Sequence, residues 1–265
     1  GLVVLPLIPN RPIEWLAGIS PRPLAALVLL ILSLQAAGHV ALRWLGPDRG
    51  LVVTGFVSGF VSSTVTIATL GRRARAEPTR GTLLSAAAVL STAATWVQVI
   101  VMSAALSPSA ARVLAPAALA GMGVALAAGA TWWLLARRGA PTKTQGEPAD
   151  SRALRPREAL IVAGLLTAVT LLISMAQTRF GATGVYAGAA LAGLADAHSP
   201  VASLTALHVG GQLAERDLLL GVLTAVSANS ATRVVVAFTT GGLRYGARVA
   251  ISLAAGLTAA WLAAL

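Results

Sequence analysis

The stretch ALAGLADAHSPVASLTAL (190–207) places an acid, a histidine and a proline in a run of otherwise apolar or small residues. An ionisable side chain and a proline are both costly inside a membrane, so neither is expected there without some gain. Pro200 has no backbone N–H and frees a carbonyl group one turn earlier, close to Asp196. We therefore predict a helix that is broken near residues 196–200, with Asp196 turned toward the protein interior.

The rest of the chain has the composition of a membrane protein. Of its 265 residues, 56% are hydrophobic and only 11% are charged, whereas about 25% are charged in a typical soluble domain. Five runs without Asp, Glu, Lys or Arg each reach the roughly 20 residues that cross a bilayer. They are residues 23–42, 50–71, 81–111, 113–136 and 159–178. These runs predict an all-α, polytopic transmembrane helix bundle.

We expect four parts along the chain. Residues 1–23 read as the end of an upstream hydrophobic segment followed by an interfacial stretch. Residues 24–136 and 159–265 form two membrane regions of four helices each, and the polar linker 137–158 joins them. The eight expected spans are 24–44, 51–71, 82–106, 113–136, 159–178, 184–208, 217–240 and 246–264.

The basic residues predict an orientation in the membrane. With the linker 137–158 in the cytoplasm, the loop 72–80 is also cytoplasmic and the turn 241–245 is external. Of the 20 Lys and Arg residues, 13 then lie inside, six lie outside, and Arg233 lies within a span. The excess inside satisfies the positive-inside rule. We expect a multi-pass protein of the bacterial inner (plasma) membrane with a cytoplasmic linker.

Charge and motifs exclude several classes of function. The net charge is +11, but the arginines occur in short clusters between apolar runs and lack interleaved aromatic residues. They therefore indicate topology signals and lipid contacts, and no nucleic-acid partner is expected. The chain has no cysteine, which excludes disulfides and thiolate metal sites. No catalytic motif is present, and the acids in or beside the expected spans, Asp196 and Glu158, are too few for paired-carboxylate chemistry, so we predict that the protein is not an enzyme.

The two membrane regions resemble each other when Gly59 is laid over Gly193. In each region a Gly-rich span leads to a polar cluster, at 62–64 or 196–198, and then to a leucine and a polar loop. We predict a duplication, with four spans in each repeat. Because four is an even number, the repeats are expected to share one orientation and to place a site at their interface.

Asp196 is the strongest candidate for a functional residue. A broken helix that presents carbonyl groups beside a carboxylate is a suitable ligand set for a hard cation. In the alternative interpretation Asp196 caps the second half of the helix, with help from Ser199. Asp196 and His198 are also the candidate ligands of a metal ion, although Asp-x-His alone is a weak metal motif. No cofactor is otherwise indicated.

Further polar side chains lie at corresponding positions of the expected spans. Ser62, Ser63, Thr64 and Thr66 complete an oxygen-rich site facing Asp196 in one interpretation, and bond to neighbouring helices in the other. Asn229 and Arg233 are four residues apart and share a helical face. If Arg233 lies near the membrane midplane it needs a partner, for which Asp196 is a candidate. If it lies near the outer end, its side chain reaches the interface.

Three motifs carry a family resemblance: LVVTGFVSGFVSSTVTIATLGRRAR (51–75), GLADAHSPVASL (193–204) and ANSATRVVVA (228–237). Together they resemble the C-terminal membrane domain of unknown function in longer members of the MgtC/SapB family of bacterial membrane proteins. The resemblance implies a link with growth at low magnesium and with regulation of other membrane proteins, and it places an MgtC-like part upstream. The second motif lacks the further acidic or polar residue that follows the first aspartate in similar sequences.

We predict an integral membrane transport protein, a channel or carrier, for a small inorganic ion, most plausibly a cation. The alternative is a regulator or scaffold that does not transport and binds another membrane protein or lipid. The expected partners are the lipid bilayer and a small inorganic ion, and homodimer formation is left open. A transport protein should have Asp196 beside a wetted cavity, whereas a regulator should have it in a dry, fully paired cluster.

Overall fold

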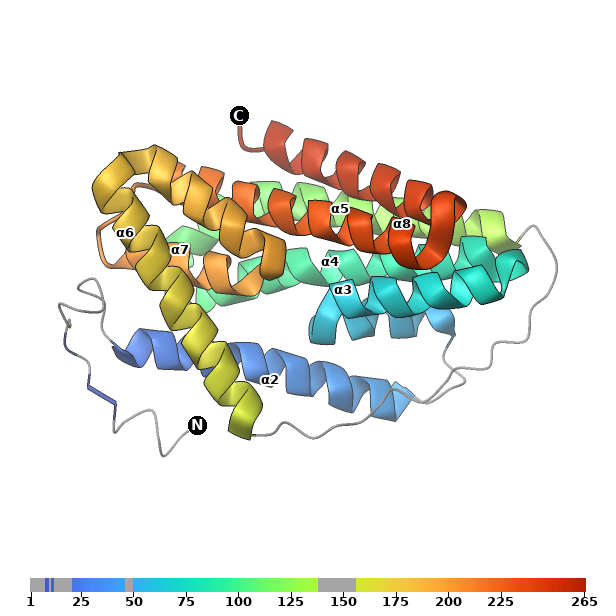
Figure 1. Cartoon of the computed structure of the whole chain (residues 1–265), viewed down its shortest axis with the longest axis horizontal. Helices are drawn as coiled ribbons and strands as arrows, with labels where there is room; N and C mark the ends of the chain where they lie inside the picture. Colours follow the sequence, from blue (N-terminus) through green and yellow to red (C-terminus); the bar gives the residue numbers. More distant parts are fainter. Residues whose placement is uncertain (1–7, 10, 12–20, 46–49, 138–155) are drawn as a thin grey trace. The chain divides into compact units, whose positions relative to one another are not determined.

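The computed structural model describes residues 8–9, 11, 21–45, 50–137 and 156–265, and all regular structure within them is helical (Figure 1). The predicted upstream segment and linker therefore lie largely outside the described residues. The elements are α2 (Pro21–Leu45), α3 (Leu51–Ala76), a 3-10 turn η3 (Pro78–Arg80), α4 (Gly81–Leu106), α5 (Pro108–Arg137), α6 (Pro156–Ala195), α7 (His198–Val209) and α8 (Glu215–Leu262).

By length and composition alone, with each element taken as a whole, five of the described helical elements could cross a membrane, namely α2, α3, α4 with its preceding 3-10 turn, α5 and α8. Large apolar side chains lie on their outer faces, as shown by Leu243, which is 77% exposed, and Ile251, which is 64% exposed. Such exposure is costly in water and favourable in lipid. The chain is thus a multi-pass helical membrane protein.

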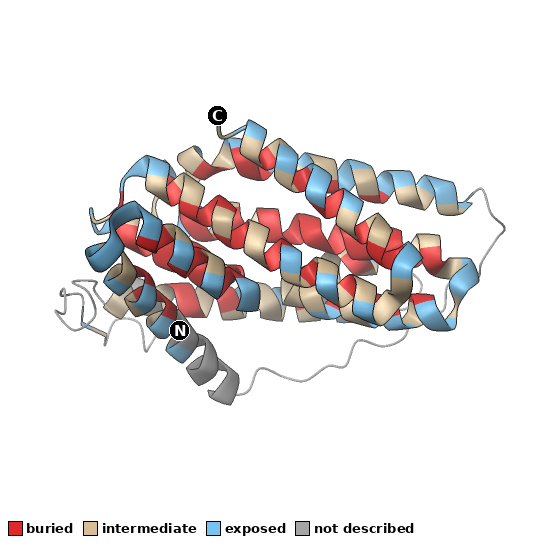
Figure 2. Ribbon diagram, turned by 45° about the horizontal axis from the view of Figure 1, so that its top comes forward, coloured by how far each residue is buried: buried red, intermediate tan, exposed pale blue. Residues whose placement is uncertain are grey.

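Small residues and hydroxyl groups fill the space between the helices, and Figure 2 shows the buried residues on the facing sides of neighbouring helices. Along α4, Ala86, Ala87 and Ala88 are completely buried. The buried hydroxyls of Ser91 and Thr92 donate to carbonyl oxygens three residues earlier, at 2.7 and 2.6 Å. Small side chains let helix backbones approach closely, which is the usual packing of membrane helices.

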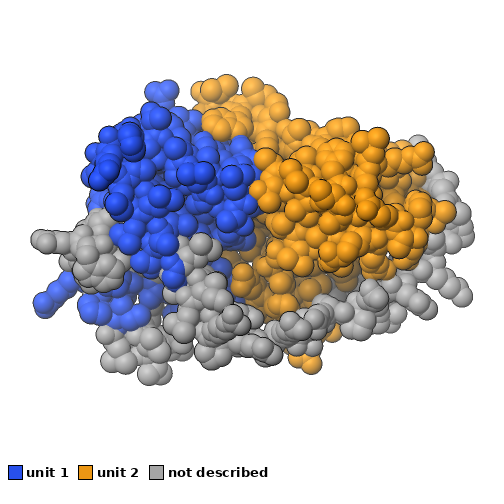
Figure 3. Space-filling view, viewed as in Figure 1, with its two compact units in different colours: residues 1–33, 99–115, 153–230 blue, residues 34–98, 116–152, 231–265 orange. Residues whose placement is uncertain are grey.

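The helices form two compact units, coloured separately in Figure 3. Unit 1 comprises residues 1–33, 99–115 and 153–230, and unit 2 comprises residues 34–98, 116–152 and 231–265. Each unit therefore contains pieces of both predicted membrane regions, and the long helices α4, α5 and α8 belong partly to each. The predicted division of the chain at the linker remains a prediction.

Two glycines turn the chain back on itself within long helical elements. Gly181 in α6 has φ 59° and Gly242 in α8 has φ 77°. Positive φ is readily adopted only by glycine, and it ends one helical segment and starts the next. Element α6 therefore consists of segments 156–180 and 182–195, and α8 consists of segments 215–241 and 243–262 (Figure 1).

In unit 2, α3 is a hairpin of two short helices with its tip at Ser62. Ser62 has extended backbone angles (φ −168°, ψ 110°). The hydroxyls of Ser58 and Thr66 lie 3.0 Å apart across the tip, although eight residues of straight helix would separate them by about 12 Å. The second arm begins with Ser63 bonded to α4 and ends at Ala76, close to the start of α4. Both ends of the hairpin thus lie at the end of unit 2 where α4 begins.

Unit 1 contains a second hairpin, formed by segment 182–195 and α7, with its tip at Asp196. Near its base, Tyr186 donates to Asp217 at 2.6 Å, whereas near the tip Asn229 contacts Gly193. The first arm therefore runs in the same direction as the beginning of α8. Helix α7 runs back and ends at Val209, just before the loop that leads into α8.

The predicted spans 51–71 and 184–208 coincide with these hairpins, and the predicted count of eight spans is not confirmed. Each is broken in the middle, and its arms hold only about 11 to 14 residues, or roughly 16–21 Å of helix, which is less than the roughly 30 Å of a bilayer core. The prediction that the loop 72–80 and the turn 241–245 lie on opposite sides is corrected. Within unit 2, Gly71 packs against Thr240 and Gly241, so the turn at Gly242 lies at the same end as the loop 72–80.

Candidate functional site

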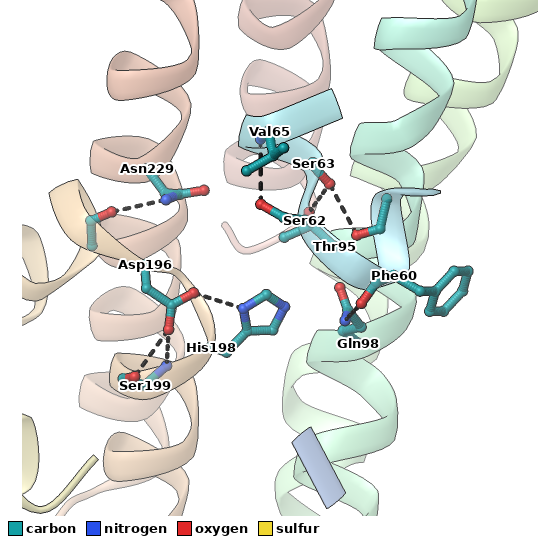
Figure 4. A network of polar contacts seen from close by, with 12 residues as sticks. Phe60, Ser62, Ser63, Val65, Thr95, Gln98, Asp196, His198, Ser199 and Asn229 are labelled. Carbon is teal, nitrogen blue, oxygen red and sulfur yellow. Dashed lines mark hydrogen bonds and ion pairs between the residues drawn. The ribbon is translucent and has the colours of Figure 1, made fainter. Parts of the chain in front are cut away.

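The tip of the unit 1 hairpin is organised around the carboxylate of Asp196 (Figure 4). One carboxylate oxygen, Oδ2, accepts hydrogen bonds from the backbone N–H and the hydroxyl of Ser199, both at 2.9 Å. Ala197 already has helical angles (φ −81°, ψ −28°), so Asp196 acts as the N-cap of α7. Pro200 lies in the first turn of α7 and has no N–H to donate to the carbonyl of Asp196, so the first bond of the turn runs from the N–H of Val201 to the carbonyl of Ala197 at 3.3 Å. The interruption predicted near residues 196–200 lies at Asp196 and Ala197.

His198 occupies the other carboxylate oxygen of Asp196. Its Nδ1 lies 2.7 Å from Asp196 Oδ1, and its side chain is 15% exposed. The second ring nitrogen, Nε2, is buried and has no hydrogen-bond partner among the described residues. A carboxylate that holds one ring nitrogen fixes the orientation of the imidazole and leaves the other nitrogen available to a ligand or proton.

Asp196 and His198 do not by themselves form a metal centre of familiar type. No cluster of three or more His, Cys, Asp or Glu side chains suited to a metal occurs in the described part of the chain. Structural and catalytic zinc sites use three or four such ligands. The predicted metal ligation by this pair remains a prediction, and it requires further ligands of another kind.

Asn229 of α8 offers a side-chain amide oxygen as a further candidate ligand. Its side-chain nitrogen donates to the carbonyl oxygen of Gly193 at 3.1 Å. Because a carbonyl only accepts hydrogen bonds, the amide group facing it must be the NH₂, and this fixes the orientation of the side chain. The amide oxygen Oδ1 is therefore the atom left buried without a partner, in a residue that is 3% exposed.

In unit 2 the hydroxyl groups predicted as site residues hold the hairpin tip together. Ser62 Oγ accepts from the backbone N–H of Val65 at 3.3 Å, so Ser62 caps the second arm. Ser63 donates to the carbonyl of Ser91 at 2.7 Å, and Thr66 donates to the carbonyl of Ser62 at 2.8 Å. These contacts fit the interpretation in which the hydroxyls bond to neighbouring helices. Thr64 is half-buried and has no hydrogen bond recorded in the described ranges.

Arg233 lies buried in the interior of unit 2. Its residue is 4% exposed, and its Nη2 donates to the hydroxyl of Thr95 at 3.0 Å. Thr95 Oγ1 also lies 3.3 Å from Ser63 Oγ, which links Arg233 to the hairpin tip (Figure 4). The predicted site is thus built as two clusters, one in each unit. The predicted single site shared by both repeats remains a prediction.

Thr95 and Gln98 are site residues that the sequence did not single out. Gln98 Nε2 donates to the carbonyl of Phe60 at 3.2 Å, and its Oε1 is buried without a partner in a residue that is 2% exposed. Gln98 therefore makes the same kind of contact as Asn229. Each side-chain amide donates to a backbone carbonyl in the first arm of a hairpin, Phe60 in α3 or Gly193 in segment 182–195. A signal was present, because Gln98 is the one amide in the uncharged run 81–111.

Comparison with known proteins identifies a family. Residues 29–241 match the family described as a domain of unknown function (DUF4010). The chain belongs to this family. The DUF4010 match covers most of the chain, including both hairpins and the segment with Asn229 and Arg233. The description of this family does not name MgtC or SapB, so the resemblance to the MgtC/SapB family remains a prediction. No curated protein and no solved structure matches the chain.

Proposed function

We propose that the protein is a transport protein, a channel or carrier, for a small inorganic cation in the bacterial plasma membrane. The observation that carries the proposal is the tip of the unit 1 hairpin, where a helix stops inside an apolar helical protein beside a carboxylate. Non-helical backbone at membrane depth is tolerated where it is buried in protein or lines a water-filled cavity. Broken helices of this type hold the ion sites of many secondary transporters.

The oxygen atoms around the tip supply ligands for a hard cation. Asn229 Oδ1 is buried and has no hydrogen-bond partner, and leaving such a group unsatisfied costs about 1–3 kcal/mol. A carboxylate has about four lone-pair sites, so Asp196 retains acceptor capacity beyond its bonds to His198 and Ser199. Carboxylate and amide oxygens are ligands that Na⁺, Mg²⁺ and Ca²⁺ accept.

The correspondences expected from a duplication of the chain, which we also propose, support the proposal. A shift of 134 residues relates Ser62 to Asp196, and each of these side chains accepts from the backbone N–H three residues later. The same shift relates two close contacts, because a Cβ added at Gly59 would overlap the carbonyl oxygen of Ser91, and one at Gly193 would overlap that of Ala225. It also relates the beginning of α4 at Gly81 to that of α8 at Glu215, and the α4–α5 turn to the turn at Gly242.

The hairpins change the membrane topology that we propose. Each repeat then has three crossing segments and one re-entrant hairpin: α2, α4 and α5 in the first, and 156–180, 215–241 and 243–262 in the second. Three crossings are an odd number, so the second repeat is inverted relative to the first. Segment 215–241 is helical throughout and roughly 40 Å long, which is enough to cross a bilayer core of about 30 Å.

The distribution of basic residues agrees with the inverted topology. With the linker still cytoplasmic, Arg43, Arg49, Arg244 and Arg248 move inside, while Arg11, Arg22 and Arg216 move outside. The 20 Lys and Arg residues then divide into 14 inside, five outside and Arg233 within a span. The positive-inside bias is stronger than in the arrangement with eight spans.

Ion flux into liposomes tests the proposed activity. The purified protein is reconstituted and assayed with a panel of cations and anions, alone and as the Asp196→Asn variant. Asparagine keeps the size and the capping ability of aspartate but removes its charge. Flux of a cation that the variant loses supports the proposal. Asp217→Asn is the matched control, because it removes an acid of the same unit at the hairpin base and should leave flux unchanged.

One observation favours the alternative of a regulator or scaffold without transport. Both oxygens of Asp196 are already hydrogen-bonded to groups of its own hairpin, as expected for a structural cap. Under this alternative no ion in the panel crosses the membrane. Flux that persists in Asp196→Asn, or an anion as the only transported ion, likewise contradicts the proposed role of Asp196.

A further inference from the structure

Seven arginines gather at the end of unit 2 that carries the hairpin base. They lie at the ends of several elements that are distant in the sequence, and they are Arg72, Arg73, Arg75, Arg80, Arg137, Arg244 and Arg248. Among the described residues at this end, the acidic residue is Glu77, whose Oε2 lies 2.9 Å from Nη1 of Arg80. Seven positive charges against one negative charge make this basic end a strong anion-attracting surface.

Contacts within unit 2 bring these arginines together. The Nη2 atom of Arg75 lies 3.9 Å from the position of a Cβ on Gly242, and Nη1 of Arg248 lies 3.7 Å from that of a Cβ on Gly81. The end of α3, the start of α4 and the turn of α8 therefore converge here. Arg244 and Arg248 are one helical turn apart and repel each other, so a bound anion would stabilise this arrangement.

The basic end also has the features of a membrane interface. Trp132 and Trp133 lie beside it, with the guanidinium of Arg248 5.7 Å from the Trp132 ring and that of Arg137 4.1 Å from the Trp133 ring. Tryptophan is enriched at the level of lipid headgroups. Leu243, next to Arg244, is 77% exposed. Arginines that can bind phosphate groups thus lie next to an exposed leucine that can contact acyl chains.

We propose that the basic end of unit 2 binds the phosphate headgroups of anionic phospholipids. The guanidinium group matches phosphate oxygens with paired hydrogen bonds. The exposed Leu243 and the half-buried Trp132 and Trp133 beside the charges favour a lipid over a soluble acidic protein or a nucleic acid, because those partners offer no acyl chain. This inference does not depend on transport, and it concerns a surface remote in sequence from Asp196.

Competitive lipid binding tests the inference. The purified protein is placed in nanodiscs that contain phosphatidylglycerol and phosphatidylcholine, and the lipids it retains are measured by native mass spectrometry. We expect the wild type to prefer phosphatidylglycerol. The triple variant Arg75→Gln, Arg244→Gln, Arg248→Gln should lose about a hundredfold of this preference, since each arginine near the surface contributes roughly fivefold.

The matched control removes three exposed arginines elsewhere, as Arg112→Gln, Arg179→Gln, Arg216→Gln. It makes the same change in net charge and should keep the preference. An equal loss in both triple variants, or no loss in the first, overturns the proposal. Competition by millimolar inorganic phosphate that fully displaces phosphatidylglycerol assigns the surface to free phosphate and also overturns it. Melting temperatures of both variants in a zwitterionic detergent check that they remain folded.

Discussion

Asp196 combines a capping role with a charge that its position makes costly. The cap needs only a side-chain oxygen that accepts from Ser199, and serine, threonine or asparagine would serve as well. At the equivalent position of unit 2 the cap is in fact a serine, Ser62. The charge of Asp196 is therefore more than the cap requires, which is the physical reason to look for a cation beside it.

Substitutions at Asp196 should separate the cap from the charge. Asp196→Ala removes the acceptor for Ser199 and should destabilise the protein by about 0.5–2 kcal/mol. Asp196→Asn retains an acceptor and should change stability much less. Melting temperatures in detergent measure the difference. A similar loss of stability in both variants would mean that the charge itself holds the tip together.

Two glycines allow the close approach of each hairpin to the helix that follows it. A Cβ at Gly59 or Gly193 would overlap a carbonyl oxygen of α4 or α8. We expect Gly59→Ala and Gly193→Ala each to destabilise the protein by about 1–3 kcal/mol through overpacking.

Gly123 in α5 is the control for these glycine variants, because nothing lies within 4 Å of its Cβ position. Gly123→Ala should be neutral or stabilise the helix by about 0.5–1 kcal/mol. Melting temperatures of the three variants should be lowered for Gly59→Ala and Gly193→Ala but not for Gly123→Ala. Equal effects at all three positions would show that the close contacts are not formed.

The sequence identified the charged members of the site more readily than the neutral ones. Asp196 and Arg233 stand out because ionisable groups are rare in spans, and both lie at hairpin tips or next to one. Thr95 and Gln98 do not stand out, since hydroxyl and amide groups in spans commonly serve packing. Their importance depends on which carbonyl they face, and that depends on a hairpin that the sequence did not predict.

At the level of elements, hydropathy measures the length of an apolar run and not its path. A hairpin with two arms of about 11 to 14 residues leaves the same uncharged run as one crossing helix. Pro200 revealed the break beside Asp196, whereas the break at Ser62 contains no proline or glycine at its tip. The second break could have been inferred by carrying the first one across the predicted repeat.

A disulfide can test the hairpin of α3 in this cysteine-free chain. The hydroxyls of Ser58 and Thr66 are 3.0 Å apart, so the variant with Ser58→Cys and Thr66→Cys should form an intramolecular disulfide under mild oxidation. The control is Thr224→Cys with Thr232→Cys, which places the same spacing on the unbroken part of α8. Mass spectrometry should find the bond in the first variant alone. Its absence there would mean that α3 is straight.

At the level of the whole molecule, the sequence predicted a helical membrane protein but not its two units. Helices α4, α5 and α8 each contribute residues to both units, so no boundary between the units appears as a linker or a change of composition. With both hairpins re-entrant, as we propose, the predicted count of eight spans falls by two, and the second repeat is inverted relative to the first. An even number of crossings per repeat gives parallel repeats, and an odd number gives inverted ones.

Single cysteines at three loops distinguish the two topologies. Thr79→Cys reports on the loop before α4, Leu243→Cys on the turn of α8, and Ala214→Cys on the loop before α8; all three positions are exposed. In the inverted arrangement Thr79 and Leu243 are cytoplasmic and Ala214 is external. An impermeant thiol reagent added to intact cells should therefore label the Ala214 variant alone, and permeabilised cells should show labelling of all three. With eight spans and parallel repeats, the reagent would label the Leu243 variant and leave Ala214 protected. That second pattern would show that the two hairpins do not enter from opposite faces, and it would remove the inverted repeat from the case for transport.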